Sequence, residues 1–237
     1  WEPSGGGVDF GVSAAASASD GRLFVGGFGA NILTLQLAPG LSVWDGTTWT
    51  DLPAPPPVDG GTTPVQPIET LAVDEQDRLI AGGAFASIGG VAANGIARWN
   101  GQSWSALGGG LAGGVRRVRS LGGGRYLAGV FTPSGGPAAS SGLAEWTGQT
   151  WVPAFVGTNS TSASITDFAF SKSGQLHASG LFVFLADGTL DTVARWNGSD
   201  WERLGAGFDV NGGVVTRLAS VCRCVSPRAR ARPSITA

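Results

Sequence analysis

Few residues of this chain could do chemistry, and they are scattered along it. The 237 residues include one histidine, His177, and one tyrosine, Tyr126. A lone histidine has no second imidazole with which to share a metal ion. In the repeats described below, His177 occupies the place of Phe24, Ile80 and Leu127. We therefore expect His177 in the core or at an interface of a strand, without a catalytic role.

Two groups of acidic residues could serve acid–base chemistry or bind a metal. A glycosidase needs two positioned carboxylates, and Asp74, Glu75 and Asp77 lie close together in the sequence. They fall in an expected turn, where solvated acidic side chains are ordinary. Asp187 and Asp191 lie in a longer expected connection beside a Gly-Thr step and indicate a turn first. A calcium contact is the alternative, but a spaced acidic ligand loop is missing.

Arg116, Arg117 and Arg119 form a small basic cluster on one expected strand. We expect a solvated or channel-lining face there, with an anion site as the alternative. The glycine runs at 108–110 and 113–114 are not phosphate loops, because no helix follows them to supply a dipole. The sequence thus predicts no catalytic residue, no cofactor and no metal site.

A tryptophan motif, Trp-x-Gly-x-x-Trp, recurs four times and organises the chain. Its copies start 55, 47 and 50 residues apart. They comprise Trp44, Gly46 and Trp49; Trp99, Gly101 and Trp104; Trp146, Gly148 and Trp151; and Trp196, Gly198 and Trp201. Each copy predicts a tight turn between two strands, with Asn-Gly as a strong hairpin signal. A two-residue turn would offset the two Trp residues, whereas a four-residue loop would place them opposite each other.

Two further apolar blocks precede each motif, so every period holds four short strands, a to d in chain order. No window has a helical period. Four antiparallel strands in a period of about 45–50 residues are typical of a β-propeller blade. We predict an all-β propeller fragment over 1–221, with four complete four-stranded blades and partial blades at both termini. The blades are expected at about 8–53, 65–107, 115–155 and 164–204.

Composition excludes several classes of protein. Four of the 15 basic residues lie after residue 221, so the first 221 residues carry 11 basic and 17 acidic groups. This balance argues against a nucleic-acid partner, and no apolar run is long enough for a membrane span. The two cysteines, Cys222 and Cys224, make neither a disulfide framework nor a four-ligand zinc site.

The motif Trp-Asn-Gly-x-x-Trp, followed by Leu-Gly-x-Gly and Ala-Gly-Gly-x-Phe, resembles kelch-type propellers of the galactose-oxidase central-domain superfamily. Within it, the pattern is most similar to bacterial surface repeats related to the cortical cell-polarity marker proteins. The shared positions are packing and turn residues, so the resemblance concerns fold more than function. Copper-radical oxidases of this superfamily need two Tyr, two His and a Cys, whereas this chain offers only Tyr126 and His177 within the repeats.

Both ends depart from the repeat. Trp1 is expected to be a stray strand d, and 214–221 a stray strand a. Residues 222–237 form an irregular basic tail with Arg223, Arg228, Arg230 and Arg232. We interpret this tail as a truncation artefact, such as an out-of-frame end; a disordered basic tail is the alternative.

Three functional hypotheses follow. The first is a non-enzymatic propeller, extracellular or at the cell surface, that presents its d–a and b–c loops to a protein or glycan partner. One Lys in the whole chain and loops rich in Ser, Thr and Gly favour it. The second is a fragment of a larger secreted oxidase or glycosidase whose active residues lie in other blades. The third is an intracellular kelch-like interaction scaffold.

Overall fold

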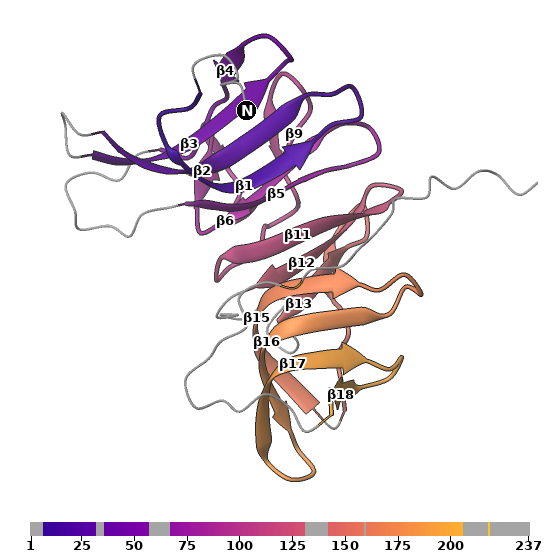
Figure 1. Cartoon of the computed structure of the whole chain (residues 1–237). Coiled ribbons are helices and arrows are strands. Elements are labelled where there is room, and N and C mark those ends of the chain that lie inside the picture. The colour runs from indigo at the N-terminus through magenta and orange to yellow at the C-terminus, as the bar shows by residue number, and fades with distance from the viewer. Residues whose placement is uncertain are drawn as a thin grey trace, which may run out of the picture.

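The computed structural model of the chain describes residues 7–31, 36–56, 67–130, 142–158, 160–205 and 218. Strands, turns and bends make up these ranges (Figure 1). None of the described residues belongs to a helix that could cross a membrane. The all-β prediction is confirmed for this part of the chain.

Four antiparallel sheets of four strands follow one another along the chain, and we call them blades 1 to 4. Blade 1 consists of β1 (Gly11–Ser17), β2 (Leu23–Asn31), β3 (Gln36–Trp44) and β4 (Trp49–Asp51). Blade 2 consists of β5 (Ile68–Val73), β6 (Leu79–Gly83), β9 (Ile96–Trp99) and β10 (Trp104–Ala106). A small hairpin of β7 (Ser87–Ile88) and β8 (Val91–Ala92) is inserted between β6 and β9.

Blades 3 and 4 have the same strand order. Blade 3 consists of β11 (Val115–Gly122), β12 (Arg125–Val130), β13 (Leu143–Trp146) and β14 (Trp151–Pro153). Blade 4 consists of β15 (Ser160–Phe170), β16 (Leu176–Phe184), β17 (Thr189–Trp196) and β18 (Trp201–Arg203). The first strand of each blade contacts the first strand of the next, in the order β1, β5, β11, β15 (Figure 1).

The apolar core lies between the blades. One cluster joins Phe24 of blade 1 to Leu79 of blade 2, the second joins Ile80 to Tyr126, and the third joins Leu127 to Phe168. A single four-stranded sheet cannot bury both of its faces, so each blade needs its neighbours to keep its apolar residues from water. This stacking supports the propeller prediction.

The two Trp residues of each motif face each other directly. Trp44 pairs with Trp49, and the three later motifs repeat this register. The ring centroids lie 5.4–5.5 Å apart in all four pairs. The alternative left open by the sequence is thereby resolved in favour of the four-residue loop.

Side-chain caps explain this loop. The Asn100 carboxamide oxygen accepts hydrogen bonds from the backbone N–H groups of Gln102 and Ser103, both at 2.9 Å. Asp45 and Asn197 make the same two contacts in their loops. The following glycine has a φ of 99° at Gly101, a conformation in which a side chain would be strained.

The second Trp of a motif also ties its blade to the preceding one. The indole N–H of Trp104 donates to the carbonyl of Pro53 at 2.7 Å, and that of Trp151 donates to the carbonyl of Leu107 at 2.8 Å. The indole of Trp201 makes the equivalent bond to Phe155. Each acceptor lies just beyond the last strand of the previous blade, so the repeated indole satisfies a chain segment that would otherwise lack a donor.

Two glycines in the second strand of blade 2 allow two close approaches. A Cβ at Gly82 would lie 2.8 Å from Val115 of the next blade, and one at Gly83 would lie 2.1 Å from the carbonyl oxygen of Pro67. Gly82 therefore lets the next blade approach, and Gly83 lets the chain segment that enters the first strand of blade 2 approach.

Candidate functional site

The first strands of the four blades, β1, β5, β11 and β15, which we call the inner strands, share an irregularity. The register with the second strand shifts once between Val12 and Ala14 and again at the corresponding place in each later blade. At this place each inner strand thus has one residue in a β-bulge, and these residues are Ser13, Glu69, Arg116 and Thr166; β11 and β15 each have a second register shift elsewhere. Bulges re-aim side chains and often adjoin functional sites.

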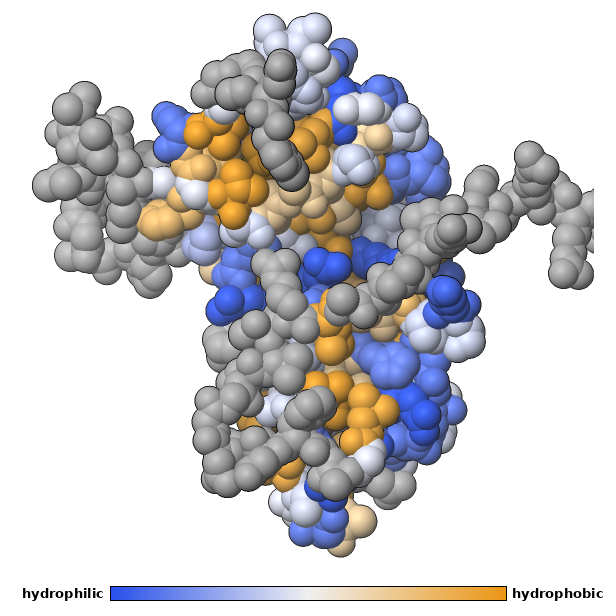
Figure 2. Space-filling view, viewed as in Figure 1, coloured by the Kyte–Doolittle hydropathy of each residue, from blue (hydrophilic) through white to orange (hydrophobic). Residues whose placement is uncertain are grey.

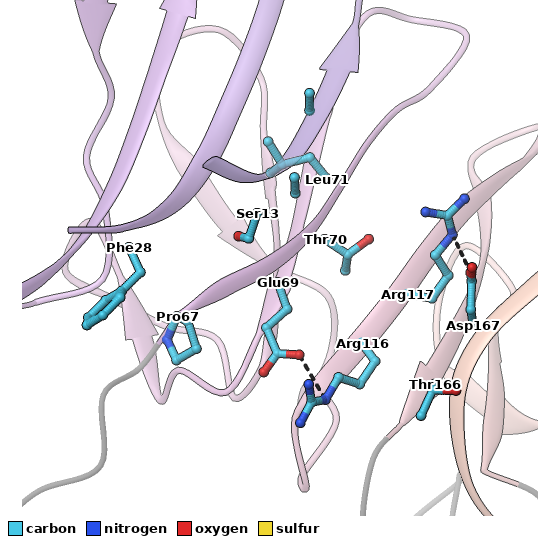
Figure 3. Close-up of a pocket in the computed structure, with 12 residues that line it drawn as sticks. Ser13, Phe28, Pro67, Glu69, Thr70, Leu71, Arg116, Arg117, Thr166 and Asp167 are labelled. Atoms are coloured by element: carbon cyan, nitrogen blue, oxygen red, sulfur yellow. Dashed lines mark ion pairs between the residues drawn. The ribbon is translucent and has the colours of Figure 1, made fainter. Parts of the chain in front are cut away.

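The bulge residues surround one cavity of about 610 Å³ (Figure 3). All four inner strands contribute to its wall. Its lining comprises Ser13, Ala14, Ala15, Phe28, Pro67, Glu69, Thr70, Leu71, Arg116, Arg117, Thr166 and Asp167. A volume of this size suits a small-molecule ligand or a short segment of a larger one.

Two ion pairs cross between blades at the cavity. Arg116 Nε lies 2.9 Å from Glu69 Oε2, and Arg117 Nε lies 3.1 Å from Asp167 Oδ1 (Figure 3). Burial raises the pKa of Glu69, and the charge of Arg116 opposes this rise. The four formal charges of the lining cancel.

Three hydroxyl groups of the lining hold the inner strands in place. Ser13 Oγ donates to the carbonyl of Ile68 in the next blade at 2.6 Å. Thr70 Oγ1 accepts from the backbone N–H of Val118 at 3.2 Å, and Thr166 Oγ1 donates to the carbonyl of Ser179 at 3.1 Å. Since a hydroxyl has one donor and two acceptor positions, Ser13 Oγ and Thr166 Oγ1 use their donor on these carbonyls, and Thr70 Oγ1 uses one acceptor position.

Asp167 holds three segments of the chain together. Its Oδ1 accepts from the N–H of Phe168, and its Oδ2 accepts from the N–H of Leu218, both at 2.8 Å. The bond from Leu218 is equivalent to the one from Val118 to Thr70, in which an inner-strand N–H reaches the side chain of the preceding blade. Leu218 is the single described residue of the expected stray strand a; Trp1, Cys222, Cys224 and the tail lie outside the described residues.

The basic cluster predicted from the sequence divides between two environments. Arg116 and Arg117 line the cavity. The guanidinium of Arg119 lies over the ring of Phe170 in blade 4, 5.5 Å from its centroid. Figure 2 shows hydrophilic surface in the band between β5 and β11, where blade 2 meets blade 3.

Asp187 and Asp191 lie apart from the cavity, in blade 4. Asp187 caps the β16–β17 turn by accepting from the N–H of Thr189 at 3.0 Å, and its hydrogen bonds to Thr189 lower its pKa. The expectation that Asp191 belongs to a connection is wrong: it is fully buried within β17, because β16 and β17 extend further than predicted. Its Oδ2 lies 3.6 Å from Arg203 Nε.

No group of three or more His, Cys, Asp or Glu that could hold a metal occurs among the described residues. His177 lies in β16 opposite Arg195 and is half-buried, unlike the fully buried Ile80 and Leu127 at its place in other blades.

The acidic cluster of the second a–b turn connects blades. Asp77 accepts from the backbone N–H and the hydroxyl of Ser19 in blade 1, at 2.8 and 2.6 Å. Glu75 accepts from the N–H of Gly124 in blade 3 at 2.8 Å. Asp74 is buried and contacts Tyr126. These carboxylates are thus engaged in contacts between neighbouring turns.

No family model matches the chain, and no curated protein matches it in sequence. Solved structures with a similar arrangement include YCF48 bound to D1 peptide, at 14% identity and a TM-score of 0.46, covering 82% of this chain and 56% of that chain. The extracellular domain of the hybrid two component system BT4673 from B. thetaiotaomicron has 14% identity and a TM-score of 0.46, covering 81% of this chain and 21% of that one. The GH74 xyloglucanase from Xanthomonas campestris has 19% identity and a TM-score of 0.44, covering 77% of this chain and 30% of that one. The chain thus spans about half or less of these proteins' lengths, and at such identities the likeness concerns the fold alone.

Proposed function

We propose that the chain is a non-enzymatic binding propeller, exported or at the cell surface, whose ligand site is the inner-strand cavity. The observation that carries this proposal is the placement of one polar bulge residue by each of four successive inner strands around a single cavity. Repeated scaffold positions with differing side chains are a means of building a binding site on a rigid frame.

The partner in this proposal is a protein segment or a glycan. The bulges of β1, β5 and β11 lie near the starts of these strands, at the end of the blades where the d–a and b–c connections run, so a partner at the cavity would also meet these connections. The kelch-type kinship and the surface location rest on the sequence motif and on the scarcity of Lys.

An enzyme fragment is the second candidate, because two carboxylates, Glu69 and Asp167, line the same cavity. A glycosidase of which this chain is one part could use such a pair. Both carboxylates are held by arginines, however, and Asp167 is 3% exposed with both oxygens occupied. This arrangement favours a role for the two carboxylates in holding neighbouring groups in position, in preference to a role in proton transfer.

The test is selection of displayed random peptides, and screening of a panel of oligosaccharides, against the folded chain and against Ala15→Trp. Ala15 is exposed and lines the cavity, so an indole there obstructs it without removing a polar contact. The matched control is Ala92→Trp, an exposed alanine of β8 outside the lining. Binders should be lost with Ala15→Trp and kept with Ala92→Trp. Absence of any binder, or binders that ignore the obstruction, would overturn the proposal.

A further inference from the structure

We infer that the ligand of the inner-strand cavity is a short neutral oligosaccharide. This inference rests on the proposed function and chooses between the two partner classes named there. Three properties of the lining carry it: its charge balance, the mixed hydrogen-bonding character of its polar groups, and an apolar wall at one end.

The charge balance disfavours an ionic ligand. Glu69 and Asp167 each lie within about 3 Å of an arginine nitrogen, at 2.9 and 3.1 Å. A ligand carboxylate placed near Arg116 or Arg117 would also lie near these two acidic groups, and it would have to displace a pair that already exists. Burial of an unpaired charge is costly. A neutral ligand meets neither obstacle.

The polar groups of the wall offer donors and acceptors side by side. In the pair of Glu69 and Arg116, the carboxylate accepts and the guanidinium donates. The hydroxyl of Ser13, whose proton goes to the carbonyl of Ile68, adds acceptor positions, and that of Thr70, which accepts from Val118, adds a donor. A sugar hydroxyl likewise donates once and accepts twice, and neighbouring hydroxyls on a ring can bridge a donor and an acceptor held together in this way.

The end of the cavity that lies away from Arg117 and Asp167 is apolar. Phe28 and Pro67 lie next to each other there, away from Arg117 and Asp167 (Figure 3). The ring of Phe28 is half-buried, so one part of it is held by the protein while another part can contact a ligand. The C–H face of a sugar ring is a flat apolar surface that packs on such a wall. A polar end and an apolar end together suit a pyranose better than a charged peptide.

The experiment compares two probes by titration calorimetry: a panel of neutral di- to tetrasaccharides of glucose, galactose, mannose and xylose, and an acidic hexaglutamate peptide. We expect at least one oligosaccharide to bind, with an affinity that changes less than twofold between low and high salt, because screening acts on net charge. Glu69→Gln with Arg116→Gln should weaken this binding at least tenfold.

Arg125→Gln is the matched control, since Arg125 pairs with Glu145 in blade 3 and does not line the cavity. It should leave the affinity unchanged. Ala15→Trp provides a second variant that keeps both ion pairs, in case the double substitution fails to fold. Oligosaccharide binding that survives Ala15→Trp would overturn the inference.

The outcomes separate this inference from the proposed function. Binding of hexaglutamate or of selected peptides at the cavity, with salt-dependent affinity and without oligosaccharide binding, would refute the glycan ligand and leave the binding propeller standing. If the binding of neither the selected peptides nor any oligosaccharide depends on the cavity, both the glycan ligand and the binding propeller are refuted.

Discussion

The phenol of Tyr126 in blade 3 donates a hydrogen bond of 2.7 Å to Asp74 Oδ2 in the a–b turn of blade 2. Arg78 Nη2 lies 2.7 Å from the same oxygen, and the N–H groups of Gln76 and Arg78 bond to Oδ1. The Asp74 side chain is fully buried. One carboxylate thus closes its own turn and holds the following blade.

Tyr126→Phe tests this contact between blades 2 and 3. Phenylalanine keeps the buried ring but removes the donor to a charged acceptor, so we expect a loss of about 1.5–3 kcal/mol in the free energy of unfolding. Urea denaturation followed by tryptophan fluorescence measures it. As a control, Arg125→Gln removes a more exposed ion pair and should cost about 1 kcal/mol or less. Equal losses from the two variants would contradict the role of Tyr126.

The stability of the protein should fall in acid partly through Asp74. Burial by itself raises the pKa of Asp74, but the hydrogen bonds from Arg78, Tyr126 and the Gln76 backbone outweigh it, so the pKa lies below 3.8. The native state therefore binds the proton less readily than the unfolded state. The stabilisation is present above pH 3.8 and is lost as the pH falls through the native pKa.

Asp74→Asn should consequently be less stable than the parent near neutral pH, and the difference should shrink in acid. Urea unfolding between pH 2 and pH 7 measures both curves. Parallel curves over the whole range would show that Asp74 does not contribute to the acid sensitivity.

The Trp residues of the motif should differ in their contribution to stability. Trp104 is 6% exposed and bonds to the preceding blade, so Trp104→Ala should cost about 3–5 kcal/mol. Trp49 occupies the same place in blade 1 but is half-buried. Trp49→Ala should therefore cost about half as much, since less apolar surface returns to water. A loss below about 1 kcal/mol for Trp104→Ala would mean that this indole does not anchor the blades.

The sequence was sufficient to predict the repeat, the strand content and a turn between the two Trp residues of each motif. It left the register open because the chain between Trp99 and Trp104 suits more than one hairpin. The register is decided by Asn100, whose side chain caps two backbone N–H groups of a four-residue loop. A polar residue directly after the first Trp is the signal that could have resolved it.

The cavity could not be predicted in the same way. Glu69, Asp167, Ser13 and Thr166 look like ordinary polar residues of half-buried strands. Their convergence depends on the bulges at one equivalent place in the four strands, which change the direction of the side chain there, and on which blades are neighbours. One sequence signal points to the bulge positions. Each bulge residue follows an apolar residue that pairs near the small residues of the second strand, as Glu69 follows Ile68, which pairs with Gly83.

Gly83 in the second strand of blade 2 provides a sharp test of the close approach near the bulge at Glu69. A Cβ at Gly83 would lie 2.1 Å from the carbonyl oxygen of Pro67, a backbone atom that accepts a hydrogen bond from Ala84 at 3.3 Å. Gly83→Ala should therefore cost about 1–3 kcal/mol or more, because the inner strand must move. Gly109→Ala is the matched control: Gly109 is exposed and a Cβ there meets nothing within 4 Å.

The destabilisation expected for Gly83→Ala should be specific to blades in which a backbone carbonyl lies against this position of the second strand. Blade 3 differs at this position. Val130 stands where Gly83 stands in blade 2, and it pairs with Val115 as Gly83 pairs with Ile68. The chain enters β11 through Gly114, whose φ is 84°, whereas Pro67 precedes β5. Val130→Gly should therefore destabilise the protein by lost burial, in contrast to Gly83→Ala, which destabilises it by overlap. If urea unfolding shows Gly83→Ala to be as mild as Gly109→Ala, the inner strand of blade 2 does not approach its neighbour as closely as the structure shows.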